Sequence, residues 1–272
     1  MRKHLSRAYL FLVFGILYIP ILTLILFSFN SANSTANFEG FSLRWYIELF
    51  NSPDAFAALR NSLILAGLSS IIATVIGTAA AEGIYKMKSK LAKAAITSVT
   101  NIPMMNPDIV TGMSMMLFFV AVAGMLSIEY ENIGFAAMLI SHVTFGLPYV
   151  ILSVLPRINE LGDSLSEAAL DLGCTPLQAF FKVKLPNIMP GVISGLIMAF
   201  TMSLDDFVIS YFVGSSNFQT LPLLIYSMTK KKVTPDMYAL STLIVITIFV
   251  MLFISNVKSG KKDNAKAGGR KK

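Results

Sequence analysis

Long apolar runs separated by short polar segments dominate this chain. A helix that crosses a membrane needs about 20 mostly apolar residues. Six segments meet that requirement, and no fixed-period sequence repeat relates them: residues 8–29, 62–85, 96–123, 133–155, 188–213 and 237–257. The pattern predicts an all-α polytopic membrane protein with six transmembrane helices.

The composition agrees with this reading and excludes several other classes of protein. Of the 272 residues, 55% are hydrophobic and 14% charged, whereas soluble domains carry about 25% charged residues. The basic residues behind the net charge of +7 lie in loops and tails and not in one stripe. Nucleic-acid binding is therefore a poor explanation of that charge. Cys174 is the only cysteine, which excludes an internal disulfide, and two histidines are too few for a usual zinc site. No resident metal or cofactor is expected.

The distribution of basic residues predicts the orientation in the membrane. Loops on the cytoplasmic side collect Lys and Arg. If the N-terminus lies inside, 17 of the 22 Lys and Arg residues fall on the cytoplasmic side, so both termini are predicted to be cytoplasmic. The first apolar run exceeds the h-region of about 7–15 residues of a signal peptide, which favours an uncleaved helix. Topology gives no explanation for the outer triplet Lys230–Lys232.

These observations predict three parts of the chain. Residues 1–58 form an N-terminal transmembrane helix and an outer loop. Residues 59–257 form the transmembrane core, which carries a cytoplasmic elbow at 160–187. Residues 258–272 are rich in Lys, Gly and Ala and form a basic tail that is predicted to be disordered.

The elbow is the longest polar stretch inside the chain, and its spacing predicts two short helices. Ser164 and Glu167 have the S-x-x-E spacing of a capping box, which predicts a helix start near Ser164. Gly173 can adopt the left-handed conformation that ends such a helix. Glu167 has two possible roles, as part of this cap or as a contact to a partner.

The second short helix of the elbow follows at once. Thr175 is a suitable N-cap, and Pro176 suits the first helical turn. Leu185-Pro186 is expected to end this helix before the fifth span begins. Taken alone, these signals describe a helical hairpin on the membrane surface.

The wider spacing of the elbow resembles a known signature. The sequence runs Glu167-Ala168-Ala169, three residues, Gly173, nine residues, Val183, one residue, Leu185-Pro186. It is similar to the EAA signature of permease subunits in binding-protein-dependent ABC importers, which usually have Ile where this chain has Val183. The resemblance implies a type I ABC importer (MetI-like) permease fold. It also implies that coupling to an ATPase subunit uses Glu167, Ala168, Ala169, Gly173, Leu185 and Pro186.

Motifs outside the elbow resemble the polyamine branch of that family, which imports spermidine and putrescine. The resemblance runs from about residue 15 to 255 and includes these motifs: Tyr18-Ile19-Pro20, Ser28-Phe29-Asn30-Ser31, Gly40-Phe41, Trp45-Tyr46, Pro107-Asp108-Ile109-Val110, Ser141-His142-Val143-Thr144-Phe145, Leu147-Pro148, Ser203-Leu204-Asp205-Asp206, Leu221-Pro222 and Ile225-Tyr226-Ser227-Met228. The resemblance implies a location in the cytoplasmic (inner) membrane of a bacterium. It implies four kinds of partner: a homologous permease subunit, two copies of an ATPase subunit that binds ATP and Mg, an extracytoplasmic polyamine-binding protein and membrane lipid.

Three carboxylates lie deep within predicted spans, where a charge is costly and suggests a functional site. Asp205 and Asp206 fall in the outer half of the fifth span, either as a negative rim that passes ammonium groups or as structural carboxylates. Asp108 follows Asn106-Pro107, which could break the third span with Pro107 as the first helical residue and Asn106 as the cap. Asp108 would then either favour the helix dipole or contact a cation.

Four further residues have structural interpretations, and two of them have a functional alternative. Trp45 and Tyr46 in the first outer loop can anchor at the membrane interface, or contact a passing polyamine or the binding protein. His142 in span four is expected to be a core histidine with satisfied hydrogen bonds. Glu82 is expected to pair with Lys86 four residues later.

Other functions stay open at this point. A permease of the same fold could serve another small solute. A channel or carrier that works without an ATPase would have no use for an EAA elbow, and the chain shows no inverted halves with paired broken helices. A membrane enzyme is disfavoured because the sequence contains no Walker A loop, H-E-x-x-H or G-x-S-x-G motif, so ATP hydrolysis is expected in a partner chain.

Overall fold

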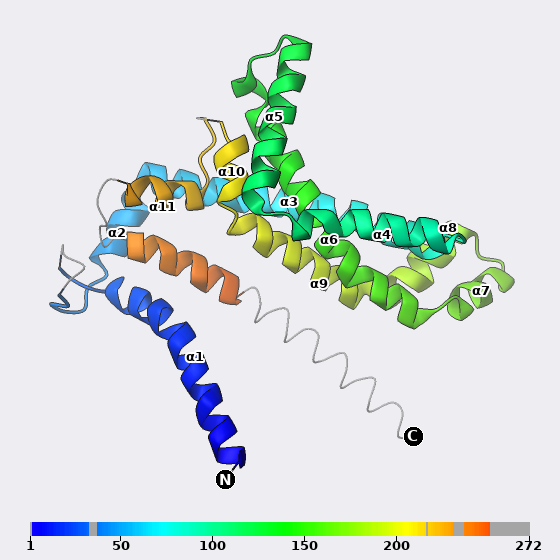
Figure 1. Ribbon diagram of the computed structural model, residues 1–272, viewed down its shortest axis with the longest axis horizontal. Helices are drawn as coiled ribbons and strands as arrows, with labels where there is room; N and C mark the ends of the chain where they lie inside the picture. Colours follow the sequence, from blue (N-terminus) through cyan, green and yellow to red (C-terminus); the bar gives the residue numbers. More distant parts are fainter. Residues whose placement is uncertain (1, 33–36, 216, 231–236, 251–272) are drawn as a thin grey trace. The chain divides into compact units, whose positions relative to one another are not determined.

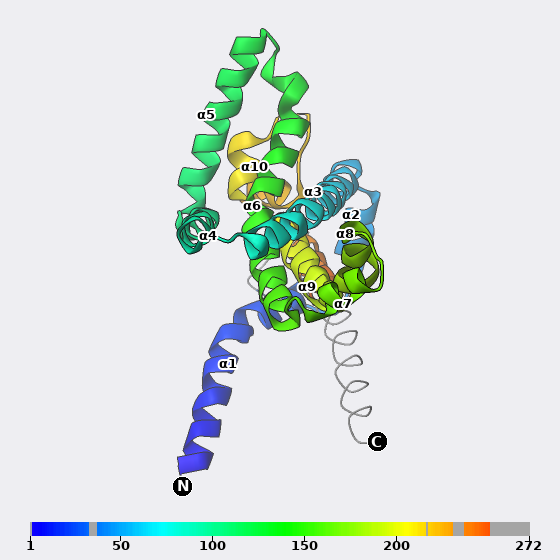
Figure 2. The same cartoon turned by 90° about the vertical axis from the view of Figure 1, so that its right-hand side faces the viewer.

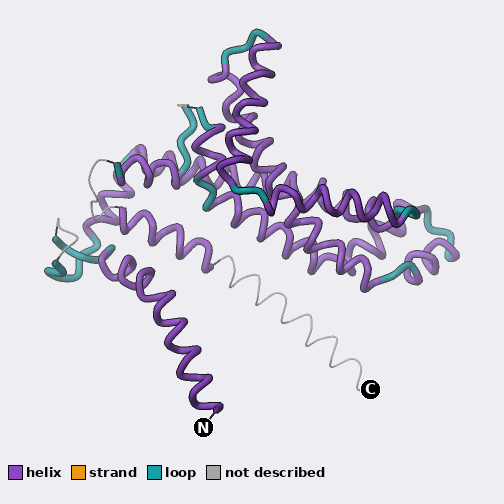
Figure 3. The backbone as a smooth tube through the Cα atoms, in the orientation of Figure 1, coloured by secondary structure: helices purple, strands orange, loops and turns teal. Residues whose placement is uncertain are grey.

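The computed structural model describes residues 2–32, 37–215, 217–230 and 237–250, which form helices and no strand (Figures 1 and 3). The prediction of an all-α fold is therefore confirmed. The predicted tail 258–272, the end of the sixth span (251–257) and Lys231 and Lys232 lie outside the described residues. Five helices in the described part are long and apolar enough to cross a membrane, and Met237–Val250 is a shorter apolar helix: Tyr9–Phe27, Pro53–Lys86, Asp108–Leu126, Tyr130–Leu161 and Pro176–Leu204.

The chain divides into two compact units. Among the described residues, those within 1–59 and 221–249 form the first unit, and those within 60–220 together with Val250 form the second. The first unit thus combines the predicted N-terminal addition, 1–58, with helices from the C-terminal part of the chain. The functional division into three parts stays a prediction.

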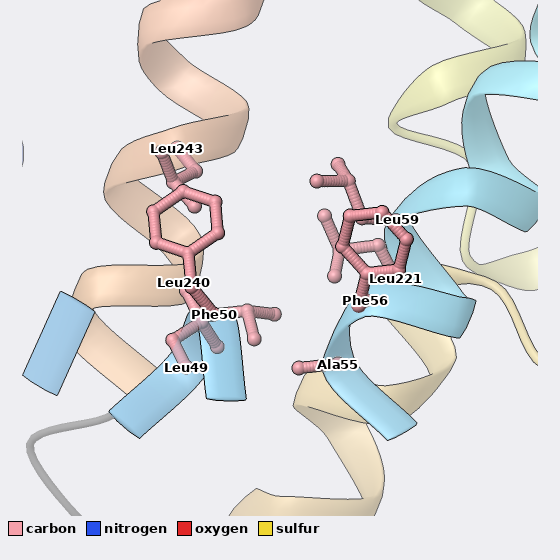
Figure 4. A pocket seen from close by; sticks show the side chains of 8 residues that line it. All are labelled: Leu49, Phe50, Ala55, Phe56, Leu59, Leu221, Leu240 and Leu243. Atoms are coloured by element: carbon pink, nitrogen blue, oxygen red, sulfur yellow. The ribbon is translucent and has the colours of Figure 1, made fainter. Parts of the chain in front are cut away.

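The first unit is built around a small apolar core. It contains α1 (Arg2–Phe27), α2 (Arg44–Asn51), the first turns of α3 (Pro53–Lys86), α11 (Leu221–Thr229) and the helix Met237–Val250. Figure 4 shows that side chains of α2, α3, α11 and the last helix line one apolar pocket: Leu49, Phe50, Ala55, Phe56, Leu59, Leu221, Leu240 and Leu243. The predicted outer loop, 30–60, therefore contains α2 and the start of α3.

Asn30 organises the segment between α1 and α2. Its side chain is fully buried; Oδ1 accepts from the backbone N–H groups of Ala32 and Glu39, and Nδ2 donates to the Asn37 carbonyl at 2.7 Å. Trp45 Nε1 donates to the Asn30 carbonyl at 2.6 Å. These bonds satisfy backbone groups that the non-helical segment would otherwise leave unpaired.

The second unit packs α3, α6 (Tyr130–Leu161) and α9 (Leu185–Leu204) around a shared core, and α6 and α9 lie side by side (Figures 1 and 2). Val150 on α6 is fully buried between two glycines, Gly77 on α3 and Gly195 on α9. A Cβ at Gly77 would lie 2.7 Å from Val150 Cγ1. Small residues permit such close approach where lipid provides no hydrophobic drive between helices.

The predicted third span, 96–123, is not one helix. It is divided into α4 (Lys90–Met105) and α5 (Asp108–Leu126), and the chain changes direction sharply between them (Figure 2). Pro107 has no N–H and disfavours the helical conformation of the preceding residue, and Asn106 is extended at φ −74° and ψ 141°. The predicted break is correct, but its cap is wrong. Asn106 ends α4, Pro107 stands before the helix, and Asp108 is its first residue.

The predicted fifth span, 188–213, differs from the helix in the structure at both ends. Helix α8 (Pro176–Ala179) continues through a π-helical turn, Phe180–Lys184, into α9, so Leu185-Pro186 does not end the second elbow helix. A π turn is one way in which a helix accommodates a residue that cannot donate a backbone hydrogen bond, as at Pro186. At the other end α9 stops at Leu204, and a turn leads to α10 (Val208–Val213).

The close contact at Gly77 can be tested by adding one methyl group. Gly77→Ala should lower the thermal midpoint of the purified protein, because fully buried, β-branched Val150 has little freedom to move. Overpacking of this kind costs about 1–3 kcal/mol. Gly67→Ala on the same helix is the control, since nothing lies within 4 Å of its Cβ. Equal midpoints for the two variants would contradict this packing. Adding Val150→Ala to Gly77→Ala should restore the thermal midpoint, because it removes the side chain that the new methyl group meets.

Candidate functional site

The first half of the elbow ends in a glycine hinge. Helix α7 (Ser164–Asp171) is followed by Gly173 at φ +87°. Gly173 N–H donates to the Leu170 carbonyl at 2.9 Å, and Cys174 N–H donates to the Ala169 carbonyl at 3.0 Å. This pair of bonds is the Schellman motif, and it satisfies carbonyls that the helix end leaves free. The predicted left-handed Gly173 is confirmed.

The cap of the second half is also confirmed. Thr175 Oγ1 accepts from Gln178 N–H at 3.3 Å, and Gln178 Oε1 accepts from Thr175 N–H at 3.1 Å. Pro176 occupies the first turn, as expected. Gln178 was not singled out, although T-x-x-Q is a capping-box spacing that the sequence displays.

The predicted cap of the first half is wrong. The residue before α7 is Asp163, and no side chain caps the helix. Ser164 is already the first residue of the helix, so it does not occupy the N-cap position. Glu167 N–H instead donates to the Asp163 carbonyl at 2.9 Å, which is the first bond of the helix. The Glu167 side chain is exposed and takes no part in a capping box.

Apolar side chains are exposed on this polar elbow. Ala169 and Ala179 are buried against the rest of the unit. On the outside, Leu172, Leu177 and Phe181 are 87%, 71% and 60% exposed. Large apolar groups in a polar segment indicate a surface for another protein.

A charged cluster joins the elbow to α3. Glu82 binds Lys86 at 3.0 Å, as predicted, and also binds Lys184, at 2.8 Å and 3.0 Å. Lys184 is only 2% exposed, and its Nζ lies 4.4 Å from the centre of the Tyr85 ring. Sequence spacing could not reveal this contact, because Lys184 and Glu82 are far apart in the chain.

The second region of interest lies at the far end of α9, about 43 Å from the start of α8 at 1.5 Å per residue over 29 residues. Asp205 and Asp206 occupy the turn between α9 and α10 and not a helix interior. Asp206 accepts from the N–H groups of Ile209 and Ser210, at 3.2 Å and 2.8 Å. Its carboxylate therefore satisfies free backbone N–H groups at the start of α10.

Asp206 also belongs to a buried polar network. His142 Nε2 on α6 lies 3.5 Å from Asp206 Oδ2 and 3.2 Å from Ser210 Oγ, and His142 Nδ1 lies 2.7 Å from Ser203 Oγ. Ser69 on α3 donates to Ser203 at 3.0 Å. The interpretation of His142 as a satisfied core histidine is confirmed.

Asp205 faces a different environment. Its residue is exposed, like Asp108 at the start of α5, and neither forms an ion pair with a basic side chain of the described residues. The phenol of Tyr149 on α6 interacts electrostatically with both carboxylates, and Phe145 packs against the Tyr149 ring at 5.8 Å. Asp108 and Asp205 therefore lie near enough to one aromatic side chain for their charges to act on it. Tyr149 was missed by sequence reasoning because it carries no motif.

The outer-loop aromatics lie in the first unit. Trp45 is buried, and Arg44 lies 5.0 Å above its ring. Tyr46 OH forms a hydrogen bond with Ser28 Oγ at 2.7 Å. Both residues hold the loop together, and their role in a substrate pathway stays a prediction.

A set of packed apolar helices joined through a helix–hinge–helix elbow defines the transmembrane subunit of an ABC importer. The chain belongs to the family of binding-protein-dependent transport system inner membrane components, which it matches over residues 73–258. It is 35% identical over 263 residues to the spermidine/putrescine transport system permease protein PotC of Haemophilus influenzae, covering 97% of this chain and 99% of that protein. It is 38% identical over 246 residues to the putrescine transport system permease protein PotI of Escherichia coli, covering 90% and 87%.

Solved structures show the same fold. A chain of a bacterial ABC transporter involved in the import of the acidic polysaccharide alginate superposes with a TM-score of 0.76 at 18% identity, covering 96% of each chain. A chain of the MetNI methionine ABC transporter in an inward-facing conformation superposes with a TM-score of 0.60 at 20% identity, covering 75% of this chain and 95% of that one. The expected MetI-like permease fold is confirmed.

The hinge can be tested at Gly173. Gly173→Ala would place a side chain in the left-handed region, at a cost of about 1–2 kcal/mol. Amide hydrogen exchange of residues 164–184 should therefore become roughly tenfold faster, because less free energy opposes local opening. Gly83→Ala on α3 is the control, since its Cβ would meet nothing within 4 Å and it lies within a helix. Unchanged exchange in Gly173→Ala would contradict the strained hinge.

The two adjacent carboxylates should respond differently to removal. Asp206→Ala leaves two backbone N–H groups without an acceptor and should lower the thermal midpoint, at the cost of about 0.5–2 kcal/mol that a lost helix cap carries. Asp205→Ala should change the midpoint little, because the side chain is exposed. Thermal midpoints of the two purified variants test this difference. A greater loss in Asp205→Ala would reverse the assignment of roles.

Proposed function

We propose that this chain is the permease subunit of an ATP-driven importer that moves spermidine and putrescine across the bacterial inner membrane. The grouping of Asp108, Asp205 and Tyr149 carries the substrate assignment. Polyamines are flexible apolar chains with ammonium groups, which carboxylates attract and which aromatic faces bind through cation–π contacts. The relatives named for spermidine and putrescine transport support the same substrate class.

The proposed machine needs several further chains. This permease pairs with a homologous PotB-like permease, two copies of a PotA-like ATPase and a PotD-like extracytoplasmic binding protein. ATP and Mg bind to the ATPase, and this chain itself catalyses no reaction. Both termini lie in the cytoplasm, which places the elbow on the side where ATP is available.

The elbow is the proposed surface for the ATPase. Its exposed apolar residues, Leu172, Leu177 and Phe181, would be costly to leave in water and suit a groove on a soluble partner. Residues Glu167 and Ala168 of the EAA signature are exposed as well. The hinge at Gly173 sets the angle between the two halves that such a groove would hold.

The negative charge of the proposed pathway favours polyamines over anionic solutes. The alginate importer has the same fold but carries an acidic polysaccharide. Two carboxylates without basic partners in the described residues would repel a polyanion and attract a polycation. A permease for another small cation is the second candidate, and a channel without an ATPase is disfavoured because it has no use for the elbow.

Neutralising the carboxylates tests the substrate assignment. Asp108→Asn and Asp205→Asn should each lower spermidine uptake at least tenfold, which needs only about 1.4 kcal/mol at the transport barrier. Spermidine, with three charges, should be affected more than putrescine, with two. Uptake is measured with the assembled transporter in proteoliposomes, and the yield of the complex is measured in parallel.

The control is Glu129→Gln, an exposed carboxylate at the start of α6 whose side chain makes no cap bond. It should transport normally. Equal and small effects of all three variants on both polyamines, with normal assembly, would rule out the proposed cation pathway.

A further inference from the structure

One buried ion pair connects the end of the elbow to α3. Lys184 Nζ lies 2.8 Å from Oε2 and 3.0 Å from Oε1 of Glu82, so both carboxylate oxygens face the ammonium group. The Lys184 side chain is 3% exposed and that of Glu82 is 12% exposed. Lys86, which shares the same carboxylate, is 65% exposed and contributes less, because water screens exposed pairs.

The position of Lys184 is unusual because it is the last residue of the π turn. The turn spans Phe180–Lys184, and Pro186 follows two residues later. Both features interrupt the regular ladder of backbone hydrogen bonds, and helices bend at such points. A force applied to the elbow would therefore bend the helix here before it moved α9.

The end of α3 holds both halves of the elbow. Tyr85 lies under the Lys184 ammonium group at 4.4 Å, and its hydroxyl interacts with the Asp163 carboxylate at the start of α7. Glu82 and Lys184 line one groove together with residues of α7 and α8. Contacts from a single helix end thus reach the start of α7 and the end of the π turn.

We propose that Lys184 is a positioning residue that, through its ion pair with Glu82, makes the elbow move with α3 as one body when the ATPase moves the elbow. This inference rests on the proposed function, since it assumes an ATPase bound at the elbow. Without the ion pair, the π turn absorbs the movement, and ATP is hydrolysed with little transport. A residue that only supported the fold would change the amount of complex and not the solute moved per ATP.

The ratio of polyamine imported to ATP hydrolysed is the decisive measurement. It is taken on the complete transporter, purified through a tag on this chain and reconstituted in proteoliposomes with its binding protein. Lys184→Met should lower the ratio at least fivefold while ATP hydrolysis stays within twofold of wild type. Lys184→Arg retains the charge and should keep most of the ratio.

Two further variants complete the design. Lys182→Met is the matched control, because Lys182 lies on the same π turn but is exposed; it should leave the ratio unchanged. A variant that leaves Glu82 buried without Lys184 risks failure to assemble. The double variant Glu82→Leu with Lys184→Met removes both charges and is expected to assemble, because an apolar pair can replace a buried ion pair. This double variant should still show the lowered ratio of polyamine imported to ATP hydrolysed.

The outcomes separate the inference from the function on which it rests. A wild-type ratio in Lys184→Met, or in the apolar double variant, would overturn the positioning role alone. Equal losses in Lys182→Met and Lys184→Met would overturn it as well. Absence of ATP-dependent polyamine uptake by the wild-type complex would overturn the proposed function, and the inference with it.

Discussion

The need to satisfy every backbone N–H and C=O group governs this structure. In the hydrocarbon core no water is available to those groups, so the chain is helical wherever it crosses. The informative places are those where the helix stops or becomes irregular: the break at Asn106-Pro107, the π turn at Phe180–Lys184 and the turn at Asp205-Asp206. Each has its own compensation, and each coincides with a region that the proposed function uses.

The turn at Asp205-Asp206 shows how one adjacent pair divides two roles. Asp206 satisfies the free N–H groups of α10 and contacts His142. A buried carboxylate is tolerated when hydrogen bonds of this kind compensate for its lost hydration. Asp205, one residue earlier, is exposed and forms no ion pair with a basic side chain of the described residues. The first carboxylate shapes the turn, and the second is the one to which the proposed function assigns a cation.

Local spacing predicted much of the architecture. The all-α fold, the left-handed Gly173, the cap at Thr175 and the Glu82–Lys86 pair all follow from residues within a few positions of one another, and all are confirmed. The EAA spacing likewise indicated the family. The role of Ser164 was mistaken because the S-x-x-E spacing fits a helix that starts one residue later than α7 does.

Other features depend on the folded chain. A proline commonly ends a helix, but here a π turn precedes Leu185-Pro186 and Pro186 lies in the first turn of α9. The helix that was expected to continue to 213 stops at Leu204, and the Asp206 carboxylate accepts hydrogen bonds from two backbone N–H groups at the start of α10. The contact of Lys184 with Glu82 and the electrostatic interaction of Tyr149 with two carboxylates join residues from separate helices, which no sequence period can place together.

The elbow combines two requirements that oppose each other. A hinge with left-handed Gly173 and a π turn allows the chain to leave the helical path and return to it, but such points bend under load. A pump must pass force from one protein to another with little loss, so its bending points need support from neighbouring groups. The end of α3 provides this support through the Glu82 carboxylate and the Tyr85 ring. Electrostatic contacts of such groups become stronger when water is excluded. A single helix end can therefore stiffen both halves of an elbow whose own backbone is irregular.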